Sequence, residues 1–243
     1  MSSILIHGAF DVLAWVAAGL AALWLSRGEK IDFPAVTTNL PYLAAILLGA
    51  GLGAYAFGTA NLWLSGVPGV ARSIEGAVAG GILAVELYKR AAGIRTRTGA
   101  RFALPFCVGV AVGRIGCYFA GIDDFTYGTP TALPWGHDFG DGISRHPVQL
   151  YEAAAMAAFA VFYVVAVRLR DPFVIDNGFY LVAAFYAAQR FGWEFFKPYG
   201  AVLGPLTLFH LLSLAIFAYA CAMIATAPHR TPAQETSDDR AVA

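Results

Sequence analysis

Long apolar runs separated by short polar connections dominate this chain and restrict what it can fold into. A helix needs about 20 mostly apolar residues to cross a bilayer. Hydrophobic residues make up 58% of the chain and charged residues 13%, whereas a water-soluble domain has about 25% charged residues. The runs lack the strict alternation of a membrane β-barrel. We therefore predict an all-α polytopic membrane protein with seven transmembrane helices, over Phe10–Ser26, Leu40–Thr59, Ile74–Tyr88, Phe102–Gly121, Pro147–Arg168, Phe179–Phe196 and Pro205–Thr226.

Lysine and arginine are distributed unevenly among the connections, and this bias predicts the orientation of a membrane protein. One set of connections is rich in them, whereas the other carries only Arg72, Arg145 and Lys197. We expect the basic set to be cytoplasmic, with the N-terminus outside and the C-terminus inside. The Gly- and Pro-containing segment Ile122–His146 is then an extracytoplasmic loop. The predicted organisation is a single transmembrane catalytic domain over residues 1–227 and a disordered cytoplasmic tail over 228–243.

Charge and cysteine content limit the partners of this chain. Its formal net charge is zero, so no basic surface points to nucleic acid. The spacing of Cys107, Cys117 and Cys221 matches neither a zinc motif nor a disulfide framework. The charge therefore gives no sign of a nucleic-acid partner, and the cysteines give no sign of a zinc knuckle or a disulfide framework.

The stretch GRIGCYFAG places Arg114 inside an apolar run, three residues before Cys117. A charge at membrane depth is costly and usually functional. The guanidinium fork of Arg114 suits a phosphate, and the alternative is an arginine that reaches the interface or pairs with an acid. For Cys117 we favour a small buried apolar residue over a reactive thiol.

Three further acidic or basic residues interrupt the apolar runs. Arg190 and Glu194 are four residues apart and so share one helix face. They either form an ion pair within the helix, or Glu194 orients Arg190 toward a second anionic group. Glu75 opens the third run, where it either stabilises the first helical turn or acts as a general base.

The segment SRHPVQLYEA is the densest polar cluster in the chain. Pro147 suits the first turn of a helix, which places the polar residues at the outer mouth of the fifth run. His146 can be a base, but we favour a hydrogen-bonded structural role. The cluster supplies these predicted substrate-binding residues: Arg145, His146, Gln149, Tyr151 and Glu152.

Glycine and alanine recur at helical spacing in LLGAGLGAYAFG and EGAVAGGILAVE. We favour close helix packing as their role. The alternative is a groove that holds a hydrocarbon tail.

GRIGCYFAG, RHPVQLYEA and QRFGWEFFKP together resemble the motifs of the prolipoprotein diacylglyceryl transferase family, and the likeness runs from Met1 to about Thr226. The resemblance implies an enzyme of the bacterial inner membrane without a cofactor. It implies transfer of the diacylglyceryl group of phosphatidylglycerol to the lipobox cysteine of a prolipoprotein, the first step of lipoprotein maturation. Glycerol phosphate leaves and a thioether forms. By the same resemblance Arg114 binds the headgroup phosphate, and Arg190 and Glu194 belong to the same site.

The chain departs from this family at several positions. Glu75 stands where the family has the histidine of HGG, and Cys117 stands where it has the asparagine of GRIGN. His7-Gly8 replaces a Tyr-Gly pair, and TYGTP around Gly128 replaces WGR. The second-span arginine of the family is absent from Gly49–Gly53. His7 and Gly128 remain among the expected substrate-binding residues.

These departures leave the base and the substrate open. Glu75, His7 and His146 are the candidates for a base, with Glu75 first by position; Glu75, Arg114 and Arg190 form the predicted catalytic set. One alternative is a divergent homologue that acts on another lipid or another thiol acceptor. Another is a non-catalytic lipid-binding or transport protein, although the sequence has no paired halves with matching broken helices.

Overall fold

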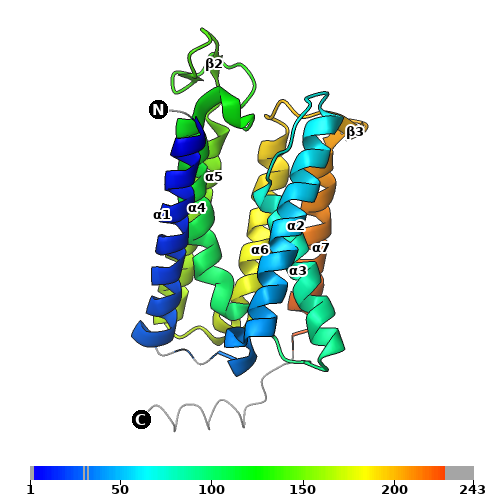
Figure 1. The fold of residues 1–243 in the computed structure, drawn as a ribbon. Coiled ribbons are helices and arrows are strands. Elements are labelled where there is room, and N and C mark those ends of the chain that lie inside the picture. Colours follow the sequence, from blue (N-terminus) through cyan, green and yellow to red (C-terminus); the bar gives the residue numbers. More distant parts are fainter. Residues whose placement is uncertain (1–2, 30, 32, 228–243) are drawn as a thin grey trace.

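A computed structural model describes residues 3–29, 31 and 33–227. Within this part of the chain the predicted all-α fold is confirmed (Figure 1). The helices are α1 (Ser3–Leu23), α2 (Leu40–Leu64), α3 (Ile74–Ala91), α4 (Ala103–Ala120), α5 (Val148–Arg168), α6 (Pro172–Glu194) and α7 (Leu208–Ala225).

Five helical segments are long and apolar enough to cross a membrane, namely Leu5–Gly28, α2, Ala100–Asp124, α5 and α7. The protein is therefore a helical membrane protein. Helices α3 and α6 fall outside this group because charged residues such as Glu75, Glu86 and Arg190 lower their hydropathy. Seven crossings and the orientation of the termini remain predictions, and the expected tail at 228–243 lies outside the described residues.

Local sequence explains where three of the helices begin. The side chain of Ser73 accepts a hydrogen bond from the backbone of Gly76 at 3.1 Å and caps α3. Asp171 caps α6 in the same way, so this helix begins at Pro172, seven residues before the predicted start. The side chain of Thr207 accepts a hydrogen bond from the backbone of His210 and caps α7. Thr207 also ends a short hairpin of β3 (Ala201–Leu203) and β4 (Leu206–Thr207).

The helices form two groups in Figure 1. Helices α1, α4 and α5 lie on one side, and α2, α3 and α7 lie on the other. Helix α6 packs against α7 and also contacts α4 and α5. It therefore joins the two groups, and its polar residues lie where both groups meet.

Helices α2 and α3 pack closely through their glycines. A Cβ atom added to Gly53 would lie 2.2 Å from the carbonyl oxygen of Gly76, and one added to Gly80 would lie 2.2 Å from that of Gly49. Any larger side chain would separate the backbones. The predicted packing role of these glycines is confirmed.

Large apolar side chains are exposed on the outer faces of the helices, as expected of a surface that faces lipid. Leu20 of α1 is 62% exposed and Leu52 of α2 is 73% exposed. Phe162 of α5 is also exposed. The hydrophobic side chains therefore serve both the interior and the lipid-facing surface.

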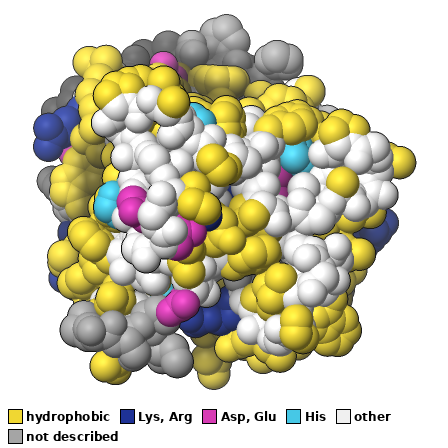
Figure 2. Space-filling model, turned by 90° about the horizontal axis from the view of Figure 1, so that it is seen from above, with side chains coloured by type: hydrophobic (Ala, Val, Ile, Leu, Met, Phe, Trp, Pro, Cys, Tyr) yellow, Lys and Arg dark blue, Asp and Glu magenta, His cyan; other side chains and the backbone are white. Residues whose placement is uncertain are grey.

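The segment between α4 and α5 is a folded excursion, as predicted. Gly121 ends α4 with φ of 76°, a conformation that favours glycine. A short 3₁₀ turn η4 (Gly121–Asp124) follows, and then β1 (His137–Asp138) pairs with β2 (Ser144–Arg145). This excursion lies at the same end of the bundle as the start of α1 (Figure 1), and Figure 2 shows that end from above, with charged side chains at only a few places among hydrophobic ones.

Candidate active site

Six charged side chains meet inside the helix bundle and form what we call the ion-pair network. They come from α3, α4, α5 and α6 and from the segment after α6, and all six are buried. The members are Glu75, Arg114, Glu152, Arg190, Glu194 and Lys197.

Arg190 lies at the centre of this network. Its Nε contacts Glu75 at 3.0 Å, its Nη1 contacts Glu152 at 2.6 Å and its Nη2 contacts Glu194 at 3.0 Å. Its guanidinium also lies over the ring of Phe209. The predicted ion pair between Arg190 and Glu194 is therefore present, but it is one of three that fix the orientation of Arg190.

Glu152, the acidic residue that ends the RHPVQLYE motif, contacts three cationic side chains. Its Oε1 accepts hydrogen bonds from Arg190 at 2.6 Å and from Lys197 at 2.5 Å, and its Oε2 pairs with the Nε of Arg114. The side chain of Glu152 is fully buried. Glu152 therefore joins α4, α5 and the segment after α6.

The other two carboxylates are held by hydroxyl groups as well as by Arg190. Ser213 of α7 donates to Oε1 of Glu75 at 2.6 Å, and Thr207 donates to Oε1 of Glu194 at 2.8 Å. Both oxygens of Glu75 are thus engaged. Sequence reasoning did not assign Ser213, Thr207 or Lys197 to the site, although Lys197, three residues after Glu194 in WEFFK, was a recognisable signal.

The charges of the network balance, because three cations face three carboxylates. Buried charges are tolerated when they are paired and hydrogen-bonded. Glu75 contributes to this balance, since a neutral residue at its position would leave an excess positive charge.

Several buried polar atoms near this level of the bundle have no hydrogen-bond partner within the described part of the chain. They include both amide atoms of Gln149, both amide atoms of Gln189, and the Nε1 of Trp193. In α6, Gln189 directly precedes Arg190, and Trp193 follows Arg190 by three residues. A buried polar atom without a partner is costly, so such atoms are suited to bind a polar ligand.

A mostly apolar cavity of about 450 Å³ opens between the two helix groups. Its lining includes Trp15 and Ala18 from α1 and Phe106 from α4. It extends to Ile74 and Gly113, which are the chain neighbours of Glu75 and Arg114. An apolar cavity beside buried charges can accommodate a molecule with an apolar body and a charged head.

The polar residues of the segment between α4 and α5 form a separate group. Arg145 donates to Asp141 at 2.6 Å and lies over the ring of Tyr127. This hydrogen bond lowers the pKa of Asp141 below its ordinary value and raises the pKa of Arg145. The structure thus places Arg145 on the loop, whereas Glu152 of the same motif enters the ion-pair network.

His146, Tyr151 and Gly128 have structural contacts in this loop. The hydroxyl of Tyr151 accepts a hydrogen bond from Nε1 of Trp135 at 2.8 Å and lies 3.4 Å from Nδ1 of His146. The backbone amide of Gly128 donates to the carbonyl of His146 at 3.1 Å, and a Cβ at Gly128 would lie 2.3 Å from that oxygen. These contacts agree with the structural role predicted for His146.

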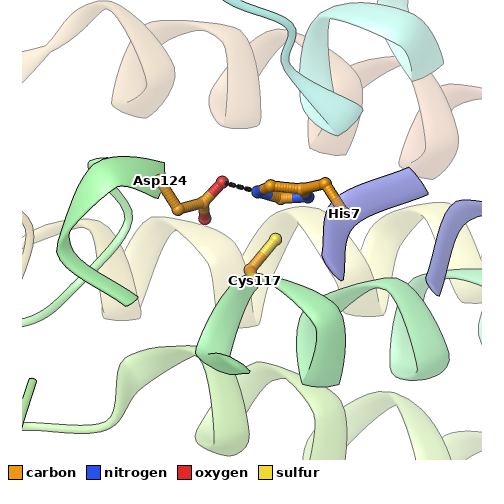
Figure 3. Close-up of side chains that lie close together, drawn as sticks. All are labelled: His7, Cys117 and Asp124. Atoms are coloured by element: carbon orange, nitrogen blue, oxygen red, sulfur yellow. Dashed lines mark hydrogen bonds and ion pairs between the residues drawn. The ribbon is translucent and has the colours of Figure 1, made fainter. Parts of the chain in front are cut away.

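His7 lies beside Cys117 and Asp124, in what we call the His7–Cys117–Asp124 cluster (Figure 3). The Nε2 of His7 is paired with Oδ1 of Asp124. The Nη1 of Arg114 lies 3.8 Å from the sulfur of Cys117, which links the cluster to the ion-pair network. Sequence reasoning missed Asp124, because only folding brings positions 7, 117 and 124 together.

The fold and the site define an integral membrane protein with an apolar cavity that leads to buried arginines and carboxylates. A profile of the family described as prolipoprotein diacylglyceryl transferase matches residues 2–226. The chain belongs to this family.

Curated relatives named phosphatidylglycerol–prolipoprotein diacylglyceryl transferase match most of the chain. The protein of Cupriavidus necator is 33% identical, with 94% of this chain and 96% of the relative covered. The protein of Geobacter sulfurreducens is 32% identical, with 83% and 79% covered. The protein of Methylocella silvestris is 32% identical, with 90% and 86% covered.

Proposed function

We propose that this protein transfers the diacylglyceryl group of phosphatidylglycerol to the lipobox cysteine of prolipoproteins in the bacterial inner membrane. The observation that carries this proposal is the position of Arg114. This arginine is buried at the level of the ion-pair network, and its neighbour Gly113 lines the apolar cavity. A lipid with its tails in the cavity would therefore have its phosphate near Arg114.

The acyl chains would enter sideways from the bilayer and lie in the cavity between α1, α3 and α4. Its lining is largely apolar, with glycines such as Gly81 and Gly109 that leave room for a chain. The hydrocarbon-groove role considered for small residues thus applies to this cavity, whereas the glycines between α2 and α3 serve packing.

The reaction has a poor leaving group, because a phosphate diester leaves as a glycerol phosphate dianion. Fixed positive charges aimed at the departing oxygen lower the barrier of such a step. Arg114 contacts one carboxylate and the sulfur of Cys117, so it is better placed to receive the phosphate than Arg190, whose three nitrogens each contact a carboxylate. Arg190 and Glu194 would then hold the surrounding acids in position.

Glu75 remains our proposed member of the catalytic set, and its contacts favour an orienting role. Its two oxygens bind Arg190 and Ser213, which leaves no oxygen clearly free to accept a proton from the acceptor thiol. Gln149, with both amide atoms unpartnered, is the proposed hydrogen-bonding group for the glycerol headgroup. Arg145 of the segment between α4 and α5 and Tyr151 in the first turn of α5 would border the entry of the prolipoprotein.

The test is a transfer assay with purified protein in phosphatidylglycerol nanodiscs and a lipobox peptide, followed by peptide mass. A diacylglyceryl adduct is expected. Lipid turnover without a modified peptide would favour another acceptor, and lipid binding alone would favour a non-catalytic protein. Rescue of a strain depleted of its own transferase is the cellular counterpart.

Arg114→Gln is the critical variant in this assay. It should lower transfer by about 100-fold or more, the size of effect seen when one transition-state donor is removed. Arg168→Gln offers a matched control, because the Arg168 side chain is 65% exposed and does not line the cavity. A folded Arg114→Gln protein with normal transfer would contradict the phosphate-binding role.

A further inference from the structure

Three metal-ligating side chains from separate elements converge beside the ion-pair network. His7 comes from α1, Cys117 from α4 and Asp124 from the 3₁₀ turn η4. Each offers one ligand atom, and these atoms all lie within 4.8 Å of one another. Figure 3 shows the three side chains pointing toward a common space. The cluster is thus assembled by the fold and is not a local sequence motif.

The chemistry of these ligands is selective. Imidazole nitrogen, thiolate sulfur and carboxylate oxygen form the donor set of zinc sites, whereas magnesium and calcium prefer oxygen ligands alone. A soft thiolate favours zinc further. Within the described part of the chain this is the one group of three such side chains with compatible distances.

Neighbouring residues orient two of the three ligands. The hydroxyl of Thr126 donates to Oδ2 of Asp124, which leaves Oδ1 directed at the cluster. The Nη1 of Arg114 donates to the sulfur of Cys117 at 3.8 Å. Outer contacts of this kind typically fix metal ligands and tune their affinity.

The charge and exposure of the cluster also suit a metal ion. A divalent cation with one thiolate and one carboxylate is neutral overall, so it would fit beside a network whose own charges balance. Cys117 is buried, but the side chains of His7 and Asp124 are 24% and 11% exposed. A fourth ligand can therefore approach from the side of His7.

We propose that the His7–Cys117–Asp124 cluster binds a zinc ion with an open fourth position that takes a thiol. Three protein ligands and one exchangeable ligand are the pattern of catalytic zinc sites, whereas structural sites have four protein ligands. The sequence predicted no metal, because its cysteines lack the spacing of a zinc motif. His7 is far from Cys117 and Asp124 along the chain, so the cluster matches no local metal-binding motif.

The role of this zinc rests on the proposed function, because the acceptor in that reaction is a cysteine thiol. The free thiol has a pKa of about 8.5, and coordination to zinc removes its proton to water. The sulfur electron pair then attacks the glyceryl carbon. The sulfur–carbon bond forms, the carbon–oxygen bond breaks, and its electron pair leaves on the phosphate oxygen as glycerol phosphate. Arg114, adjacent to Cys117, would stabilise that departing oxygen.

The experiment uses the full-length protein in detergent micelles, freed of metal by a chelator and titrated with cobalt(II) as the probe. Binding through Cys117 should give a sulfur-to-cobalt charge-transfer band at about one ion per chain, and zinc should displace the cobalt. Cys117→Ser should abolish the band, and His7→Gln and Asp124→Asn should weaken binding. Cys221→Ser is the matched control, because this cysteine is exposed on α7 and should leave the titration unchanged.

A further variant guards against loss of folding. Thr126→Ala removes an outer contact and should weaken cobalt binding by about 10- to 100-fold while the protein stays folded by circular dichroism. The site is refuted if the wild-type protein gives no sulfur band, or if Cys117→Ser binds cobalt as tightly as the wild type.

Adding a lipobox peptide to the cobalt-loaded protein tests the role separately. A stronger sulfur band is expected as the acceptor thiol enters the fourth position, and a peptide with serine in place of the cysteine should cause no change. An unchanged band with the cysteine peptide would refute the thiol-binding role. A band that responds while no adduct ever forms would refute the proposed transferase activity and leave the metal site standing.

Discussion

Replacing Glu152 with glutamine should be one of the most damaging conservative changes in the protein. Glu152 is fully buried and is the carboxylate that contacts Arg114 and Lys197. Arg190 retains Glu75 and Glu194 when Glu152 is lost, but the other two cations lose their carboxylate partner. Leaving a buried charge unpaired costs about 3–5 kcal/mol.

Arg114→Gln should cost less, because the remaining partners of Glu152 still compensate its charge. Glu152 keeps Arg190 at 2.6 Å and Lys197 at 2.5 Å in this variant. The loss is then that of one charge-assisted contact, about 1.5–3 kcal/mol. Asp11→Asn serves as a surface control. The side chains of Asp11 and its partner Arg72 are 44% and 56% exposed, and such a pair is worth about 0–1 kcal/mol.

The assay is reversible unfolding in mixed micelles of a mild detergent and sodium dodecyl sulfate, followed by circular dichroism. The free energy of unfolding should fall most for Glu152→Gln, less for Arg114→Gln and least for Asp11→Asn. If Glu152→Gln costs no more than the other two, the idea that Glu152 holds the network together is wrong. The transfer assay gives a different order, since Arg114→Gln should lose activity beyond its loss of stability.

Two further predictions concern Glu75 and the loop between α4 and α5. Glu75→Gln should slow transfer by about tenfold, which is the difference between a charge-assisted and a neutral hydrogen bond to Arg190. The dependence of the transfer rate on pH should stay the same as in the wild type. If the variant instead no longer loses activity as the pH falls, Glu75 is the base. Because Arg145 lowers the pKa of Asp141, their pair stabilises the loop above the ordinary pKa of about 3.9 and is lost as pH falls through the lowered value. An added protease should therefore cleave this loop faster in Asp141→Asn than in the wild type at pH 7. In acid, where the pair is lost, the fluorine NMR spectra of fluorine-labelled Trp135 should become the same for both proteins. Equal rates of cleavage at pH 7 would show that the pair does not stabilise the loop.

Much of the fold could be predicted from the sequence, because the need to satisfy backbone groups in lipid turns an apolar run of sufficient length into a helix. The predicted runs correspond to α1–α7, and the glycines at helical spacing pack α2 against α3. The start of α6 was missed because Asp171 and Pro172 initiate the helix before its apolar stretch begins. Hydropathy identifies an apolar stretch of the sequence, whereas capping residues determine where the helix begins.

The sequence also identified Arg114, Arg190, Glu194 and Glu75 as charges that need an explanation, because an ionised side chain among apolar residues is costly. Glu152 was predicted only as a member of a polar cluster. The spacing of the charged residues indicated one pair, Arg190 with Glu194. It gave no sign that Glu152 contacts two arginines and a lysine, or that the hydroxyl of Ser213 binds Glu75.

The sequence by itself therefore determined the apolar helical runs, the family motifs and several of the charged residues that interrupt those runs. Only the tertiary structure decided which of them meet, since contacts across helices depend on packing rather than on spacing along the chain. His7 and Cys117 are the clearest case. In the sequence they are separate departures from the family pattern, and in the folded protein both lie beside Asp124, where their side chains can act on one ligand.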